Sequence, residues 1–487
     1  MCSIHLNMDL LVEALHKANI IKEKNSIEMM ASLCCSVYNS DCLRRICTIC
    51  KEKVLDYKEF RNDRELKYYS WTRQNKQYVT IDKKKREISI IAKSATHVTP
   101  IRAIQKLDED LPYFFLHCNN ILNQFNEIKK LKERLRIHET ILHIDFLENY
   151  AIKFAKEVQA LHFGGSRSQI ALHTAVVYTH NFQSGRVEPI SVCAVSDCVR
   201  HDASAIWAHL TPLIQLALEK NPFTTTLHFL SDSPSSQYRN KFIFYMISQL
   251  HIDFPQLITV IWNYSEKGHG KGAPDGVEAV LKRTADAAVK FGEDVANLTD
   301  FVKILESRVK NIIIIPVTEQ NIIEKEKKIP KNATPFRGTL SVHQVLWKKD
   351  QDYITFRNLS CFSCEPGEIC RHGLHSGFMK NRGKITDNLQ QSKDFVAALV
   401  RTKKCSSVIR PNIDSTNDVA EDAVPKKRPK ITVLQNLLLV SAKDNINNLI
   451  ASTSKETDTN ESIHNKENLF DVGDLVPPNI LLKKPNF

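Results

Sequence analysis

The chain lacks any long uninterrupted run of apolar residues. No window approaches the roughly 18 consecutive apolar residues that a membrane-spanning helix needs, so the sequence predicts no membrane segment. The first residues contain no basic stretch, and Asn7, Asp9 and Glu13 interrupt their apolar residues, so we expect no secretory signal. Without export, the 13 cysteines are expected to be thiols or metal ligands rather than disulfides.

The sequence also lacks internal repeats, and its composition is that of an ordinary globular protein. Of its 487 residues, 42% are hydrophobic and 25% are charged, which predicts about two to four domains with cores of normal size. Lysine and arginine outnumber aspartate and glutamate by 67 to 55, which gives a net charge of +12. Many basic proteins never bind nucleic acid, but this excess of cations suits a polyanionic partner such as DNA.

Composition and periodicity divide the chain into five segments. They are a cysteine-rich region at 1–118, an amphipathic helix at 119–140, a core of strands and helices at 141–300, an extension with more cysteines at 301–375, and a polar tail at 376–487. A hairpin with a basic tip at 83–86 is expected in the first segment. The apolar stripe of the helix is expected to pack on the neighbouring core, with a homo-oligomer as the alternative. The tail is expected to be largely disordered.

Residues 141–300 alternate predicted strands and helices in an order that few folds share. Apolar runs and alternation predict strands at 141–146, 169–178, 189–196, 225–230 and 257–264, and helical spacing predicts helices at 202–218, 235–250 and 276–291. Three strands in succession, followed by alternating helices and strands, are typical of the ribonuclease H-like fold. We therefore predict an α/β protein with a ribonuclease H-like mixed sheet, flanking helices, a cysteine-rich N-terminal region and a disordered C-terminal tail.

Acidic residues occur at the ends of these elements. Asp145 ends the first strand, Asp232 follows the fourth, and Asp275 opens the last helix. The first and fourth strands are neighbours in this fold, so Asp145 and Asp232 are expected side by side. Shared carboxylates of this kind hold two Mg²⁺ or Mn²⁺ ions in enzymes that cleave phosphodiesters. The three acids are predicted to be catalytic metal ligands, with Glu278 as the alternative third ligand.

Each acid also has an ordinary explanation. Asp145 could simply end a strand, Asp232 could belong to a turn, and Asp275 could cap the helix that follows Pro274. Their joint occurrence at three matching positions of one fold favours the catalytic interpretation.

A glycine-rich basic loop precedes the last predicted helix. Glycines at 268, 270 and 272 alternate with His269 and Lys271, and a helix N-terminus suits a phosphate group. The Gly-Lys-Ser/Thr ending of a nucleotide-binding loop is missing, so nucleotide hydrolysis is not inferred. His269, Lys271, Lys282 and Arg283 are predicted to bind nucleic acid. The alternative is a glycine-rich turn followed by a solvated helix face.

Several short motifs occur together in this chain. They are DFLENY at 145–150, EVQALHFG at 157–164, SD at 231–232, QYRN at 237–240, HGKG at 269–272, DG at 275–276 and KR at 282–283. As a set, they resemble a large family of transposon-derived proteins that is abundant in insects and other invertebrates. Members of that family look like DDE-type transposases, and the resemblance runs from about Cys34 to Cys370. It implies Mg²⁺-dependent DNA cleavage and strand transfer by Asp145, Asp232 and Asp275.

Two departures from the family pattern leave alternatives open. Ser233 stands where a glycine is expected, and Glu278 stands where a small residue is usual. Together with the short N-terminal region, they favour a domesticated, catalytically inactive protein that binds DNA or chromatin. The intact acids favour an active enzyme. A ribonuclease or exonuclease with the same core is a third hypothesis.

Two groups of cysteines have spacings typical of structural zinc sites, although buried free thiols would also explain them. In the first, Cys47 and Cys50 form a C-x-x-C pair that Cys42 and either Cys35 or Cys34 would complete. The second group consists of Cys361, Cys364, Cys370 and His372. Four protein ligands leave no position for water, so zinc would be structural in both.

Residues 425–430, PKKRPK, form a short basic run in the polar tail. Such runs arise by chance in basic tails, but this composition is typical of a nuclear localisation signal. We therefore expect a nuclear protein, which agrees with DNA as its partner.

Overall fold

The computed structural model describes residues 2–79, 85–159, 167–331, 333, 338–351, 353–365, 370, 372, 376–380 and 385–386. Within these residues the chain forms two compact units, one ending at Leu122 and the other beginning at Asn123. Among the helices in this part of the chain, none combines the length and the apolar character that crossing a membrane requires. The basic run at 425–430 and the polar tail from 387 onward lie outside the described residues.

The first unit packs short helices against the first part of a long one. Helix α1 (Ser3–Lys17) buries Met8, Leu11, Val12 and Leu15, a spacing that gives a helix one apolar face. Helices α2 (Ser26–Leu33) and α3 (Ser40–Leu43) follow, and an asparagine side chain caps the start of each. Their buried residues form one core with those of α4 (Pro100–Glu133) up to Leu122.

Helix α4 begins and ends earlier than the helix predicted for 119–140. A proline inside a helix removes a hydrogen bond and usually ends it, so Pro112 argues against a helix that continues through this position. The helix does continue, because buried residues recur every three or four positions from Ala103 to Cys118. Further along, Leu131 is buried and Ile128 packs on the core of the second unit, as predicted for this stripe.

The predicted hairpin is confirmed and is longer than its sequence pattern indicated; residues 83 and 84 of its predicted basic tip lie outside the described residues. Strands β1 (Leu66–Val79) and β2 (Lys85–Val98) pair antiparallel over their whole length. Except for Leu66 and Tyr68, the side chains of both strands are exposed or half-buried. Alternation of apolar and polar residues marks a strand with one buried face, so this pattern indicated only part of the length of these strands.

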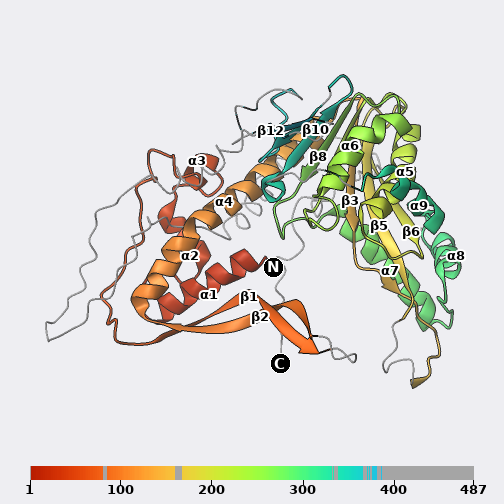
Figure 1. Cartoon of the computed structure of the whole chain (residues 1–487). Coiled ribbons are helices and arrows are strands. Elements are labelled where there is room, and N and C mark those ends of the chain that lie inside the picture. Colours follow the sequence, from red (N-terminus) through yellow and green to blue (C-terminus); the bar gives the residue numbers. More distant parts are fainter. Residues whose placement is uncertain are drawn as a thin grey trace, which may run out of the picture. The chain divides into compact units, whose positions relative to one another are not determined.

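The second unit is built on a mixed sheet with the predicted ribonuclease H-like order of strands (Figure 1). Its central strands, in order across the sheet, are β6 (Val187–Ser196), β5 (Gln169–His180), β3 (Glu139–Phe146), β7 (Thr226–Ser231) and β8 (Thr259–Tyr264). The pairs β6–β5 and β5–β3 are antiparallel, whereas β3–β7 and β7–β8 are parallel. The short strand β4 (Tyr150–Ala151) pairs with β5. The predicted α/β fold class is confirmed.

The sheet extends beyond these strands at both edges. Strand β9 (Ile312–Pro316) joins β6 in parallel. At the other edge, β10 (Gln344–Lys348) and β11 (Tyr353–Arg357) continue antiparallel from β8. Strands β12 (Ser376–Lys380) and β13 (Ile385–Thr386) follow, so the sheet reaches past the expected start of the tail at 376.

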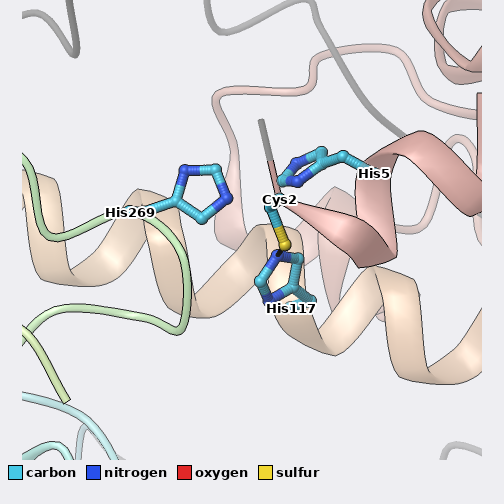
Figure 2. A group of neighbouring side chains, drawn as sticks. All are labelled: Cys2, His5, His117 and His269. Atoms are coloured by element: carbon cyan, nitrogen blue, oxygen red, sulfur yellow. Dashed lines mark hydrogen bonds between the residues drawn. The ribbon is translucent and has the colours of Figure 1, made fainter. Parts of the chain in front are cut away.

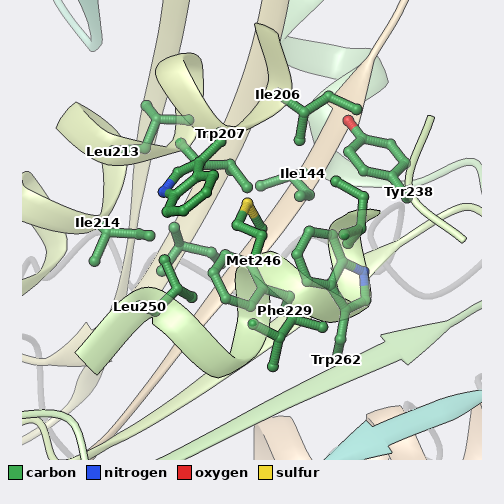
Figure 3. Close-up of a cluster of buried hydrophobic side chains, with 14 of the residues drawn as sticks. Ile144, Ile206, Trp207, Leu213, Ile214, Phe229, Tyr238, Met246, Leu250 and Trp262 are labelled. Carbon is green, nitrogen blue, oxygen red and sulfur yellow. The ribbon is translucent and has the colours of Figure 1, made fainter. Parts of the chain in front are cut away.

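Helices cover both faces of this sheet. On one face, α5 (Ala203–Lys220) and α6 (Lys241–Asp253) bury an aromatic and aliphatic core against the strands (Figure 3). On the other, α7 (Ala273–Lys290) and α8 (Leu298–Arg308) form a second core. A further helix, α9 (Glu319–Lys328), and a short 3₁₀ turn (Thr339–Ser341) follow. Helix α6 begins later than predicted because the Asn240 side chain caps it, accepting from Phe242 N–H and Ile243 N–H.

The first of these cores supplies a test of the fold. Phe229 is fully buried, and its ring stacks on Trp262 with a centroid distance of 4.4 Å. We expect Phe229→Ala to lower the free energy of unfolding by about 3–5 kcal/mol, because it leaves a cavity. The matched control Phe291→Ala, at a side chain that is 82% exposed, should change it by less than about 0.5 kcal/mol. Chemical denaturation of both variants measures the difference, and equal effects would contradict the packing described.

Candidate functional site

Asp145 and Asp232 lie at the same end of two neighbouring parallel strands. In the pairing of β3 with β7, each residue on β7 has a number 87 higher than its partner, as in Glu139–Thr226. Continued by two residues beyond the last pair, this register places Asp232 opposite Asp145. Neighbouring strands lie about 4.8 Å apart, so the two side chains share one edge of the sheet, as predicted.

Both carboxylates lie on the face of the sheet that α7 covers. On β3, Ile141 belongs to the core beneath α7, and Asp145 points to the same face because side chains alternate along a strand. On β7, Leu230 belongs to that core, and Asp232 lies two residues later. The sheet therefore directs both acids toward the helix that carries the other two candidates.

Three other acidic side chains lie near enough to Asp145 to affect its ionisation. Burial raises the pKa of the Asp145 carboxyl to about 8. The negative charges that add to this shift belong to Asp232, Asp275 and Glu278. Burial, followed by the charge of Asp275, also raises the pKa of Asp232 to about 7. Carboxylates perturb one another in this way at short range, so β3, β7 and α7 together form one acidic site.

One oxygen of Asp232 is buried and, among the described residues, has no hydrogen-bond partner. This atom, Oδ1, is shielded from solvent, and such a group is costly unless something satisfies it. Arg239, which is 5% exposed, contributes a positive charge that lowers the pKa of Asp232. Its Nη1 donates instead to the carbonyl oxygen of Val342, at 3.1 Å. The site therefore retains a carboxylate oxygen suited to a cation.

Two glycines allow the loop before α7 to close against the strands. A Cβ on Gly270 would lie 2.3 Å from Cβ of Asp232, and a Cβ on Gly272 would lie 2.4 Å from Cε1 of His143. Real Cβ atoms do not approach so closely, so both positions require glycine. The glycine-rich loop thus holds the start of α7 beside the two strand ends.

Asp275 and Glu278 already have partners in this structure. Oδ2 of Asp275 accepts from Gly272 N–H at 2.8 Å, which caps the start of α7, and Oδ1 lies 3.7 Å from Nζ of Lys271. Oε1 of Glu278 lies 2.6 Å from Nζ of Lys282. Asp275 therefore caps the helix, and its charge also affects Asp145 and Asp232; its role as a metal ligand stays a prediction.

The residues predicted to bind nucleic acid gather on the same loop and helix. Lys271 and Lys282 form the ion pairs with the candidate acids. Nε of Arg283 donates to the carbonyl oxygen of Ala279 in its own helix, at 2.9 Å. His269 lies in the loop, where its N–H donates to the carbonyl oxygen of Glu266 at 2.9 Å. Two of the four side chains are thus partly committed to balancing the charge of the acidic site.

Sequence reasoning missed a group of histidines around Phe146, the residue after Asp145. The Phe146 ring stacks on those of His173 and His201, with centroid distances of 4.6 and 4.1 Å. His173 is fully buried and shares a hydrogen bond of 2.9 Å with the Tyr238 hydroxyl. Burial lowers the pKa of His173 far below its usual value and that of His209 to about 4. These neutral histidine rings hold the end of β3 in place. The only sequence signal for the group was the occurrence of single histidines within apolar segments.

Residues 124–360 match a family model described as a domain of unknown function, DUF8701. No curated protein and no solved structure matches the chain. The region matched by DUF8701 begins within α4 and contains all four candidate acids. Both cysteine clusters lie outside it, one on each side.

The cysteine cluster before the DUF8701 region brings four sulfur atoms together. Sγ of Cys35 lies 3.3 Å from Sγ of Cys42, 3.6 Å from that of Cys47 and 3.8 Å from that of Cys50. Tetrahedral zinc with bonds of about 2.3 Å spaces its sulfur ligands by about 3.8 Å, so this cluster could hold a structural zinc ion. Sγ of Cys34 instead donates to the carbonyl oxygen of Cys42, which makes Cys35 the fourth ligand.

The cluster after the DUF8701 region has a similar arrangement. Nδ1 of His372 lies 3.2 Å from Sγ of Cys364 and 3.8 Å from Sγ of Cys361, and Cys370 completes the group. Arg357, only 1% exposed, donates to the carbonyl oxygen of Cys361 at 2.8 Å. This buried guanidinium orients the loop that carries the ligands, and this group too could hold a metal ion.

The choice between Cys35 and Cys34 can be tested by metal analysis. We expect Cys35→Ala to lower the zinc content of the purified full chain by one ion, because it removes one ligand of four. Cys34→Ala is the matched control and should retain the wild-type content. Inductively coupled plasma mass spectrometry measures both, and loss of zinc from the Cys34 variant alone would contradict this assignment.

The close approach of the glycine loop can be tested by adding one methyl group. Gly270→Ala should lower the free energy of unfolding by about 1–3 kcal/mol, because Cβ of Asp232 cannot move aside without moving its strand. Gly276→Ala, in the first turns of α7 with nothing within 4 Å of its Cβ position, should raise it by up to about 1 kcal/mol. Chemical denaturation compares the two, and equal stability would contradict the described loop.

Proposed function

We propose that this protein is a transposase-like, divalent-metal-dependent enzyme that cleaves DNA and transfers the cut strand. The observation that carries the proposal is the register of β3 and β7, which sets Asp232 opposite Asp145. Asp275 and Glu278 of α7 lie near enough to add to the pKa shift of Asp145. A purely structural role for one buried and three half-buried acids is hard to support, because neighbouring carboxylates raise the cost of ionising Asp145 and Asp232.

The residues of the site fit Mg²⁺ or Mn²⁺. All the candidate ligand atoms are hard carboxylate oxygens, which these ions prefer, and Oδ1 of Asp232 has no partner among the described residues. Bound there, two such ions would stabilise the attacking and leaving oxygens of a phosphodiester. Asp145 and Asp232 would supply the shared ligands, and Asp275 or Glu278 would supply the third.

The chain's own residues fix the geometry of this site. The paired strands hold Asp145 and Asp232 in register, and the stacked rings around Phe146 limit movement of the β3 end. Lys271 and Lys282 balance the charge of the acids, and we propose that they turn to DNA phosphates when that charge is neutralised. His143 stays neutral, because burial lowers its pKa to about 3, so it adds no charge.

We propose the β1–β2 hairpin as a second DNA contact. Its strands contain Lys67, Arg73, Lys76, Lys85, Arg86 and Lys93, all exposed, against a single acid, Glu87. Each strand has 14 residues and so spans about 46 Å, more than one turn of DNA at about 34 Å. A two-stranded ribbon fits the major groove of DNA.

We also propose that the protein is located in the nucleus. The basic run at 425–430 supports this location.

An inactive, domesticated DNA-binding protein is the second candidate function. The partners of Asp275 and Glu278 favour it, because both acids are satisfied by groups of the chain itself. DNA binding would then depend on the basic hairpin and remain after the acids are removed. The following experiments separate the two functions.

Cleavage of DNA tests the enzyme directly. With Mg²⁺ or Mn²⁺, the purified full chain should nick plasmid DNA, and Asp145→Asn or Asp232→Asn should each lower the rate on the order of 10³-fold, because metal-ligand charge is worth several kcal/mol in such reactions. Asp300→Asn, in the first turn of α8, is the control and should nick at the wild-type rate. A wild-type chain that binds DNA but never nicks it would support the inactive protein instead.

The third ligand can be identified by comparing two amide substitutions. If Asp275 serves the metal as well as the helix, Asp275→Asn lowers both the cleavage rate and, by about 1 kcal/mol, the free energy of unfolding, because it weakens the helix cap. Glu278→Gln removes no cap and should affect cleavage alone if Glu278 is the ligand. Nicking assays and denaturation of both variants give the answer; full activity in both would exclude a third carboxylate from either position.

The salt dependence of DNA affinity tests the hairpin. The triple variant Arg73→Ala/Lys76→Ala/Arg86→Ala should bind duplex DNA more weakly than wild type. The slope of log affinity against log salt concentration should become less steep by up to about 2.7, because each lost phosphate contact lowers its magnitude by about 0.9. The control removes the same charge from exposed lysines of the second unit, as Lys303→Ala/Lys310→Ala/Lys327→Ala. Equal slopes in the two triple variants would contradict a role for the hairpin.

A further inference from the structure

We infer that Cys2, His5 and His117 form a third site for zinc or a similar thiophilic cation, in addition to the two cysteine clusters. All three residues belong to the first unit, and none of them is among the carboxylates proposed to cleave DNA. Neither cysteine cluster contains any of them. The inference therefore does not rest on the proposed function.

The ligands come from two helices that are distant in the sequence. Cys2 immediately precedes α1, at its N-cap position, and His5 lies in the first turn of that helix. Residues three apart on a helix lie on one face, so the spacing C-x-x-H presents a thiol and an imidazole together. His117 comes from α4, 115 positions after Cys2. Figure 2 shows the Cys2 sulfur and the His5 and His117 rings turned toward one another.

The distances match those of a metal centre. Sγ of Cys2 lies 3.5 Å from Nε2 of His117, and the rings of His5 and His117 have a centroid distance of 4.9 Å. One ligand atom from each of the three residues lies within 4.8 Å of the others. Zinc bonds of about 2.3 Å to sulfur and about 2.0–2.1 Å to nitrogen, at the tetrahedral angle, require a separation of about 3.6 Å between the two ligands. The observed S–N distance agrees with this value.

The surroundings favour a soft cation. Cys2 is 7% exposed and His117 is 3% exposed, and the His5 ring packs edge-on against Phe114 with a centroid distance of 5.4 Å. A thiolate and two imidazoles in such a setting select zinc rather than the ions that carboxylates prefer. Three protein ligands leave one coordination position for water or another ligand. The ion would fasten the start of α1 to α4.

A simple thiol–imidazole hydrogen bond between Cys2 and His117 is the competing explanation, and metal content distinguishes the two. The full chain, purified with zinc, should contain three zinc ions, one for each cysteine cluster and one for this site. Cys2→Ala and His5→Gln should each contain two. Cys118→Ala, a buried neighbour of His117 on α4, is the matched control and should contain three. Unchanged zinc in both Cys2→Ala and His5→Gln would overturn the inference.

A second background keeps the test decisive if a variant loses stability. In a chain that carries Cys42→Ser/Cys47→Ser and Cys361→Ser/Cys364→Ser, each cysteine cluster keeps only two of its four ligands, and one zinc ion should remain. With Co²⁺ in place of zinc, that ion should show a sulfur-to-cobalt charge-transfer band, because Cys2 supplies a thiolate. Absence of the band in this background, with helical circular dichroism retained, would overturn the inference without reliance on the Cys2 substitution.

Discussion

The parallel pairing of β3 with β7 is the interaction on which the rest of the proposed site depends. It fixes a register in which Asp145 and Asp232 end neighbouring strands opposite each other. A shift of one residue would turn either side chain to the opposite face of the sheet. The apolar residues of both strands prevent that shift, because Leu142 and Phe229 are buried on one face while Ile141 and Leu230 are buried on the other.

This arrangement concentrates negative charge in a buried place, which opposes folding. Burial and mutual repulsion raise the pKa of Asp145 and Asp232, so their ionised forms are disfavoured until a positive charge arrives. The fold offsets the cost in part with Lys271, Lys282 and the buried Arg239. Gly270 and Gly272 let α7 begin close enough for its acids to join the strands. This cost is the reason for our proposal that the acids bind a cation.

Much of the second unit could be predicted from the sequence, because its elements are regular and its acids stand at their ends. Local patterns also found the cysteine clusters, but only the fold could choose Cys35 over Cys34. Features that depend on distant residues escaped prediction, such as the added strands beyond β6 and β8 and the pairing of Cys2 with His117. The sequence pattern placed the helix at 119–140, whereas α4 begins at Pro100 and continues through Pro112 because its buried neighbours stabilise it. For Asp275, sequence left two roles open; the structure shows the helix cap, and the role as metal ligand stays a prediction.

Binding of Mn²⁺ to the zinc-loaded chain, measured by electron paramagnetic resonance, tests the central claim most directly. The claim is that the register of β3 and β7 creates one divalent-cation site from Asp145 and Asp232. Wild type and Asp300→Asn should bind Mn²⁺ equally, whereas Asp145→Asn and Asp232→Asn should each lose that binding while remaining folded. Equal Mn²⁺ binding by all four proteins, or by none, would contradict it.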